Sequence, residues 1–202
     1  MGKKRYLAIG CIILGIWVMM IPSVKESVED QRQQKILTQW KQEMNRIGSG
    51  EKTAETGKNI AKRISAKENS EVVGVLRIPI IELEQPVLKG ATEHNLNLSV
   101  ATVEPTGKPG ADGNFALAGH NSRTYGRHFN RLAELKIGDE LFVDTRRETY
   151  AYRVTDVYVA GAEDVWVLED SMDGAEITLI TCHYPKEGKK QRLIVKGLLQ
   201  EK

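Results

Sequence analysis

Short apolar runs rich in valine and isoleucine fill the chain from Glu71 onward, and glycine or proline separates them. The stretch VVGVLRIPIIELEQPVLKG has this character, and so do GNFALAGH, ELFVDT, ETYAYRVTDVYVA, EITLITC and RLIVKGLL. Runs of this kind predict β-strands, because β-branched side chains fit a pleated surface and the interruptions suit turns. About eight short strands with little helix favour an all-β fold, a closed barrel or a sandwich.

Two local signals refine this prediction. Arg146 and Arg147 separate two alternating runs, which indicates a β-hairpin. Thr92 stands before the segment EHNLNL and is typical of the residue that caps a short helix.

The N-terminus has the pattern of a membrane anchor. Lys3, Lys4 and Arg5 precede an uncharged run from Tyr6 to Pro22, which is at the short end of what a membrane-spanning helix needs. No small-x-small cleavage site follows, so an uncleaved anchor is favoured over a signal peptide. The basic cluster is expected to stay in the cytoplasm. We therefore expect residues 1–23 to form a cytoplasmic N-terminus and anchor, in a single-pass type II protein of the cell membrane with its main domain extracellular.

Residues 24–70 read as a helical stalk followed by a flexible linker. Strong helix formers run to about Ile47, with a few apolar residues at helical spacing: Ile36, Leu37, Trp40, Met44 and Ile47. So few apolar residues predict a solvated or weakly docked stalk, and whether it docks on the main domain and regulates it stays open. The linker, Gly48 to Ser70, has little to bury. Residues 71–202 remain as the β-rich domain.

Charge and motifs exclude several function classes. The 29 basic and 27 acidic residues leave a net charge of +2, which gives no nucleic-acid footprint. The sequence holds no motif for a nucleotide, flavin or haem, so we expect no cofactor.

Cysteine usage draws attention to Cys182. The chain has two cysteines, and Cys11 lies inside the expected anchor, so Cys182 has no disulfide partner in the exported domain. Cys182 ends a predicted strand, and Arg192 begins the next one. If the two strands pair antiparallel about Glu187, Cys182 and Arg192 lie nearly opposite each other. A neighbouring guanidinium stabilises a thiolate and can donate hydrogen bonds to an oxyanion.

A catalytic cysteine also needs an acid or base, and the chain has four histidines. His183 follows Cys182 directly, so on a strand it points to the opposite face. His94 and His128 lie in polar, turn-like segments. His120 ends a predicted strand and is the best candidate by position.

The segments GNFALAGHN, EITLITC and RLIVKG together resemble the signature segments of the sortases, and the resemblance extends over roughly Val72 to Leu199. It is closest to class A, while TCHYP is similar to the T-C-Y-P of class D. The resemblance implies a closed eight-stranded β-barrel and a cysteine transpeptidase. In that reaction Cys182 is the nucleophile, Arg192 stabilises the oxyanion and His120 protonates the departing amine.

The resemblance also implies substrates and partners. The substrates are secreted proteins with a C-terminal LPxTG-like sorting signal, cleaved between Thr and Gly. The acceptor is an amine of the peptidoglycan precursor in a Gram-positive cell wall. The loop before the cysteine strand grips the signal in this family, which points to Val165, Trp166 and Val167, and the backbone near Thr181 assists the oxyanion.

Two metal alternatives accompany this interpretation. Zinc at His120, Cys182 and His183 lacks the usual ligand spacing. Some class A sortases hold calcium between acidic loops, and the comparable carboxylates here are Glu104, Asp112, Glu163 and Asp164. They are scattered, so a solvated surface is expected instead of a metal site, with calcium as the alternative.

Other functions also stay open. A class D or pilin-type sortase would read a different sorting signal. An L,D-transpeptidase also uses Cys, His and Arg, but its S-H-G-C motif is absent, since Ile180 and Thr181 precede Cys182. A membrane-tethered binding module with a degenerate site is the third alternative.

Overall fold

The computed structural model describes residues 11, 27–46, 71–122, 124, 126–184, 188 and 190–200. The predicted anchor, apart from Cys11, and the predicted linker lie outside these residues. Within the described ranges, we find no helix of sufficient length and hydrophobicity to cross a lipid bilayer.

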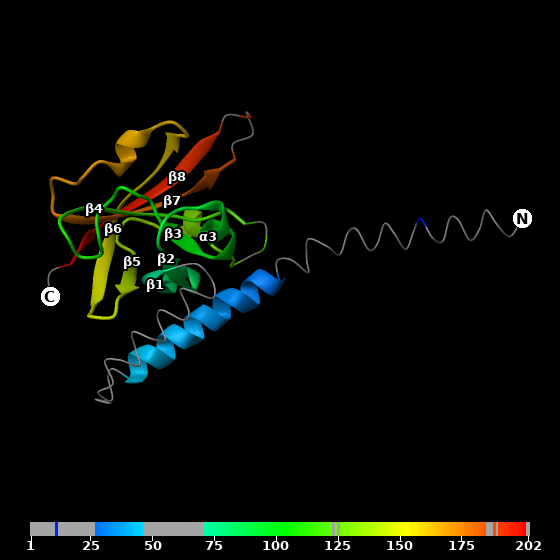
Figure 1. Ribbon diagram of the computed structural model, residues 1–202. Coiled ribbons are helices and arrows are strands. Elements are labelled where there is room, and N and C mark those ends of the chain that lie inside the picture. Colours follow the sequence, from blue (N-terminus) through cyan, green and yellow to red (C-terminus); the bar gives the residue numbers. More distant parts are fainter. Residues whose placement is uncertain are drawn as a thin grey trace, which may run out of the picture.

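The β-rich region forms a closed barrel (Figure 1), which confirms the barrel over the sandwich. The described residues contain eight strands: β1 (Val72–Ile78), β2 (Leu83–Leu88), β3 (Val100–Thr102), β4 (Gly113–Ala118), β5 (Glu140–Asp144), β6 (Thr149–Gly161), β7 (Ala175–His183) and β8 (Gln191–Leu199). Their order around the barrel is β1-β2-β3-β4-β7-β8-β6-β5. The pairs β2–β3 and β4–β7 are parallel, and the other pairs are antiparallel.

Short helices connect the strands. They are η1 (Pro79–Ile81), α3 (Glu93–Leu98), η2 (Leu132–Glu134) and η3 (Val165–Leu168). Thr92 caps α3 by accepting a hydrogen bond from the Asn95 amide at 3.2 Å, as predicted. The predicted hairpin around Arg146 and Arg147 is also confirmed, because it joins the antiparallel strands β5 and β6.

Alternate residues of the strands fill the barrel. The interior is apolar and includes Leu76, Phe115, Leu117, Leu141, Tyr152, Ile177 and Leu179. Since side chains alternate along a strand, the neighbours of these residues point outward. On β7 the outward set includes Ile180 and Cys182, and on β8 it includes Arg192 and Ile194.

A long helix over residues 27–46 packs on the outside of the barrel beside β1 and β2 (Figure 1). Ile36 contacts Leu88 and Leu98, while Leu37 and Trp40 pack on Val75. These contacts contradict a solvated stalk over residues 27–46; docking on the barrel, which the sequence left open, is what the structure shows. The three apolar side chains share one face of the helix, and the barrel offers them a matching apolar surface.

Polar contacts reinforce this docking. Gln33 donates to the Ser99 hydroxyl, and Lys41 pairs with Glu84 at 2.7 Å. The Arg146 guanidinium lies over the Trp40 ring and pairs with Glu43.

Candidate functional site

Cys182 and Arg192 face each other across strands β7 and β8, as predicted. Arg192 Nη1 donates to the Cys182 sulfur at 3.5 Å, and both side chains are half-buried. The rigid antiparallel ladder sets this distance, because the two residues are direct partners in register. The thiol therefore lies next to a fixed positive charge while solvent can still reach it.

His120 reaches the same place from strand β4. In the parallel ladder of β4 and β7, Ala118 pairs with Ile180, and the Gly119 amide donates to the Ile180 carbonyl at 3.0 Å. Continuing the ladder by two residues puts His120 alongside Cys182, with both side chains on the outer face of the barrel. The His120 side chain is exposed. The three residues selected from the sequence thus come from the ends of three adjacent strands.

Two side-chain hydrogen bonds fix this junction. Asn121 Nδ2 donates to the Cys182 carbonyl at 2.9 Å, and the Thr181 hydroxyl donates to the Gly119 carbonyl at 2.8 Å. The Thr181 side chain is only 2% exposed. The side chain points inward because it alternates with Cys182 along β7, so the role predicted for Thr181 stays a prediction about its backbone.

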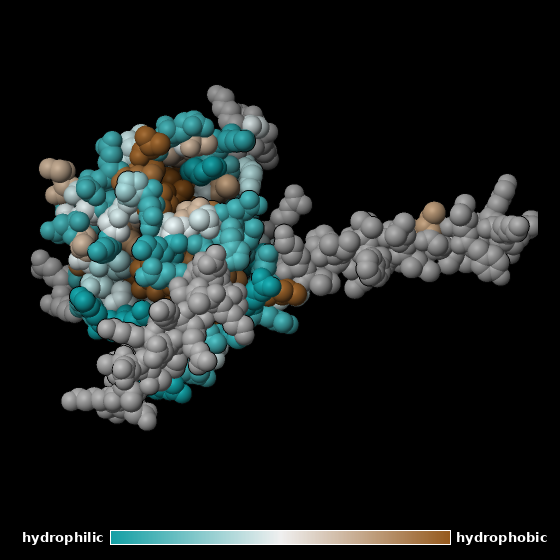
Figure 2. Space-filling model, in the orientation of Figure 1, coloured by the Kyte–Doolittle hydropathy of each residue, from teal (hydrophilic) through white to brown (hydrophobic). Residues whose placement is uncertain are grey.

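An apolar patch lies next to Cys182 on the outer face of the barrel. We call it the outer-face patch, and it consists of Ala160, Val167, Ile194, Tyr158, Leu168 and Ile180. The η3 segment covers part of it. Figure 2 shows hydrophobic surface beside this segment, in a hollow bordered by hydrophilic residues.

The three η3 residues predicted to bind substrate differ in exposure. Trp166 is 51% exposed and stacks on Tyr158, with ring centroids 5.8 Å apart, and Val165 is more exposed still. Val167 is 6% exposed and belongs to the floor of the patch. The structure therefore offers Val165 and Trp166 at the rim, with Val167 supporting them from below.

Asn114 holds η3 in place, and the sequence reasoning missed it. Its side-chain Nδ2 donates to the carbonyls of Val167 and Glu169 at 3.0 and 3.1 Å. Asn114 is fully buried in an otherwise apolar strand. A polar residue inside the run NFALA was the available signal, since a buried amide needs partners.

Tyr158 is a second residue that the sequence reasoning missed. Its hydroxyl is buried and has no hydrogen-bond partner within the described part of the chain. Burial, followed by the charges of Glu176 and Asp156, raises its pKa. Nothing in the run ETYAYRVTDVYVA distinguishes this tyrosine from the others.

The four carboxylates considered for calcium do not form a cluster. Among the described residues, no three His, Cys, Asp or Glu side chains come together in a way that could hold a metal ion. Asp164 instead accepts a hydrogen bond from the Gly161 amide at 2.6 Å and shapes the turn before η3.

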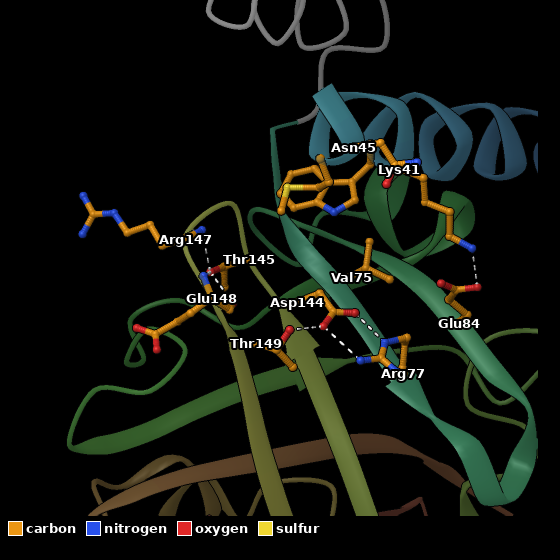
Figure 3. A pocket seen from close by; sticks show the side chains of 12 residues that line it. Lys41, Asn45, Val75, Arg77, Glu84, Asp144, Thr145, Arg147, Glu148 and Thr149 are labelled. Atoms are coloured by element: carbon orange, nitrogen blue, oxygen red, sulfur yellow. Dashed lines mark hydrogen bonds and ion pairs between the residues drawn. The ribbon is translucent and has the colours of Figure 1, made fainter. Parts of the chain in front are cut away.

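Two pockets lie elsewhere on the molecule and share no lining residue with the cysteine site. One, of about 460 Å³, lies between the helix over 27–46 and the barrel. Figure 3 shows two ion pairs among its lining residues, Lys41 with Glu84 and Arg77 with Asp144. The other lies between the start of β1 and the β5–β6 hairpin, near Lys89, Lys108 and Arg146.

Similar solved structures support the fold. A Clostridium perfringens sortase D5 transpeptidase is 25% identical with a TM-score of 0.65, and the match covers 87% of this chain and 99% of that one. Listeria monocytogenes sortase A is 32% identical with a TM-score of 0.58, covering 64% and 88%. A C. perfringens sortase C, whose structure contains the C-terminal cell wall sorting motif, is 27% identical with a TM-score of 0.58, covering 65% and 72%.

Sequence comparisons agree. Residues 76–200 match the Sortase domain. Sortase A of Bacillus anthracis is 38% identical over 67% of this chain, and sortase A of L. monocytogenes is 31% identical over 71%. In both cases the match spans 63% of the relative's own length. Because the Sortase domain matches more than half of the residues of this chain, the chain belongs to the sortase family.

Proposed function

We propose that this chain is a cysteine transpeptidase that cleaves an LPxTG-like sorting signal between Thr and Gly and joins the protein to a cell-wall amine. The observation that carries the proposal is the Cys182–Arg192 pair at 3.5 Å, with His120 alongside at the end of the neighbouring strand. Nucleophile, oxyanion donor and proton donor thus stand on one face of a rigid sheet.

In the first half of the reaction, the Cys182 thiolate attacks the carbonyl carbon of the substrate threonine. Arg192 donates hydrogen bonds to the oxygen that becomes negative, and such donors act most strongly when they are held in place beforehand. The Thr–Gly bond then breaks, and His120 gives its proton to the departing glycine amine. The product is a thioester between Cys182 and the threonine carbonyl.

In the second half, an amine of the peptidoglycan precursor attacks the thioester. His120, now neutral, takes a proton from the incoming amine, and the Cys182 thiolate leaves. A new amide bond joins the secreted protein to the wall, and both catalytic groups return to their starting protonation states.

The outer-face patch is the proposed binding surface for the apolar part of the sorting signal. It lies on the same face as Cys182 and presents Trp166 and Val165 at its rim. A structure of a similar sortase C with the C-terminal cell wall sorting motif supports a sorting signal as the ligand.

We place the enzyme at the outer surface of the cell membrane. The basic residues Lys3 to Arg5 and the uncharged run that ends at Pro22 support a single-pass anchor with residues 71–202 outside. Protease accessibility of a C-terminal tag on intact cells tests this orientation. Resistance of the tag on intact cells would contradict it.

A class D specificity is the second candidate. The run TCHYP and the similarity to the sortase D5 transpeptidase favour it, while the relatives at 38% and 31% identity are sortase A proteins. Peptides that differ at the variable position and after the threonine distinguish the two.

The direct test is turnover of a fluorogenic LPxTG peptide with and without an added amine, in parallel with Cys182→Ala. Cleavage and amine-dependent ligation that disappear in the variant are expected. Absence of turnover across all sorting-signal variants, with and without calcium, would refute the proposal.

A further inference from the structure

A loop between β4 and η2 folds back beneath His120. Asn121 forms an isolated β-bridge with His128, and the Phe129 amide donates to the His120 carbonyl at 3.0 Å. The His128 ring meets the His120 ring at an interplanar angle of 71°, with centroids 6.3 Å apart. The described loop therefore supports His120 through both its backbone and an aromatic ring.

His128 occupies an unfavourable position. Its backbone has a φ of 52°, in the left-handed region, which is uncommon for residues other than glycine. The side chain is 2% exposed, and among the described residues neither ring nitrogen has a hydrogen bond of normal geometry, although the Asn97 backbone lies nearby. Burial, with smaller contributions from the charges of Arg127 and His120, lowers the His128 pKa to about 4. A neutral, strained and buried histidine persists only when its surroundings hold it there.

Arg127, the preceding residue, fixes the backbone at His128 through its own hydrogen bonds. Its side chain is 11% exposed and donates to Asp30 Oδ1 at 2.7 Å, to Glu29 Oε2 at 3.1 Å and to the Asn97 carbonyl at 3.3 Å. Burial opposes the charge of Arg127, but the two carboxylates outweigh it and keep the Arg127 pKa above its ordinary value. Both acidic partners belong to the helix over residues 27–46, almost a hundred residues earlier.

This helix is itself fixed on the barrel through Ile36, Leu37 and Trp40. Arg127 therefore connects a docked element to the loop that carries His128 under His120. On the other side, the same loop reaches the nucleophile, because Asn121 is bridged to His128 and donates to the Cys182 carbonyl. A continuous series of contacts thus runs from the acidic start of the helix to the cysteine site.

We propose that Arg127 is a positioning residue for His120, and that its ion pairs with Glu29 and Asp30 make the N-terminal helix part of the support of the active site. The proposal rests on the function proposed for His120. When the ion pairs are lost, the turn at 127–129 is released, His128 becomes solvated and the His120 ring loses its neighbour. Turnover then falls although Cys182, Arg192 and the outer-face patch are unchanged.

Removing or exchanging the charges of Arg127, Glu29 and Asp30 tests the positioning role of Arg127, with the full chain in detergent micelles. Arg127→Gln and Arg127→Glu are each expected to lower kcat on an LPxTG peptide by about 10- to 100-fold, since small misplacements of a catalytic group have effects of this size. KM is expected to stay near the wild-type value. Glu29→Lys with Asp30→Lys should give the same loss, and combining these changes with Arg127→Glu should recover at least about tenfold, as expected for directly coupled residues.

Lys41→Glu is the matched control. It removes the ion pair with Glu84, which also joins helix and barrel but does not touch the loop, so kcat should stay within about twofold. A comparable loss in this variant, or failure of the charge exchange to recover activity, would overturn the proposal.

A second measurement does not depend on turnover. The chain has four histidines, so their ring protons are readily resolved by NMR in histidine-labelled protein. His128 is expected to titrate near its value of about 4 in the wild type and Lys41→Glu, and to move towards 6.5 in Arg127→Gln. An unchanged His128 titration in Arg127→Gln would overturn the positioning role even if kcat fell. Inactive wild-type protein would refute the proposed function. The His128 titration would still test whether Arg127 and its ion pairs keep His128 buried.

Discussion

Arg192 and Cys182 illustrate how single residues depend on strand register. They are direct partners in the ladder of β7 and β8, and Arg192 donates to the thiol at 3.5 Å. A guanidinium has several donors in a fixed plane, so it can hold both the sulfur and an oxyanion, whereas an ammonium is a flexible point charge.

Replacing Arg192 by Lys keeps the charge but loses this geometry. We expect kcat to fall by roughly 10²–10³-fold, the usual effect of removing one oxyanion donor. Steady-state kinetics on a sorting-signal peptide measures it, with thermal unfolding to show that the fold is intact. A kcat within about twofold of wild type would show that charge alone suffices.

Gly119 has a close contact that permits no side chain. A Cβ at this position would lie 2.6 Å from Cδ2 of Phe129 and 3.0 Å from Cγ1 of Val100. Gly119→Ala should therefore push apart the His120 loop and β3, with a loss of about 1–3 kcal/mol in the free energy of unfolding. Denaturant unfolding measures it. Undiminished stability together with undiminished turnover would contradict the tight packing beneath His120.

His128 predicts how stability depends on pH. Its pKa is lowered from 6.5 to about 4 in the folded state, so below pH 6.5 the unfolded chain binds a proton that the folded chain does not. The contribution of His128 to the free energy of unfolding is therefore fully present above pH 6.5. It is lost as the pH falls to about 4. The loss amounts to about 3 kcal/mol.

His128→Phe removes this titration, and any backbone strain that it retains does not depend on pH. The difference in the free energy of unfolding between variant and wild type should therefore grow in favour of the variant between pH 6.5 and 4. Denaturant unfolding at several pH values measures it. A difference that stays constant over this range would show that His128 is solvated in the folded protein.

Among the elements, the helix over residues 27–46 is the one whose docking on the barrel the sequence left open. Five apolar residues recur at helical spacing, but so few favour a solvated or weakly docked stalk over a firmly packed helix. Docking is decided by the complementary surface of Val75, Leu88 and Leu98, which exists only after the barrel forms.

Trp40→Ala is expected to release the helix without unfolding the barrel. The variant loses the packing on Val75 and the Arg146 guanidinium over its ring. Hydrogen exchange should then speed up over residues 27–46 and stay slow in β7 and β8. Faster exchange throughout the barrel would instead show that helix and barrel unfold as one unit.

The strands were predictable for a simple reason. Their β-branched runs and turn residues are local signals, and the Cys182–Arg192 register follows from a short hairpin-like connection. His120 beside Cys182 was not derivable from spacing, because it depends on the parallel pairing of β4 with β7, between which β5 and β6 intervene in the chain. The contact of Arg127 with Glu29 and Asp30 is more distant still and has no local signal.

At the scale of the whole molecule, the barrel brings the ends of β4, β7 and β8 to one place and covers the adjacent apolar patch with η3. The docked helix adds a contact from the N-terminal region to the loop beneath His120. In this arrangement we expect Cys182 to be the nucleophile that carries the acyl group.

Trapping that acyl group on the protein tests this role of Cys182. The full chain is mixed with an LPxTG peptide without an amine acceptor, quenched in acid and analysed by intact mass and peptide mapping. We expect an added mass equal to the peptide up to and including the threonine, located on Cys182, released by hydroxylamine and absent from Cys182→Ala. Cleavage of the peptide without an adduct on Cys182, or with an adduct that persists in Cys182→Ala, would contradict it.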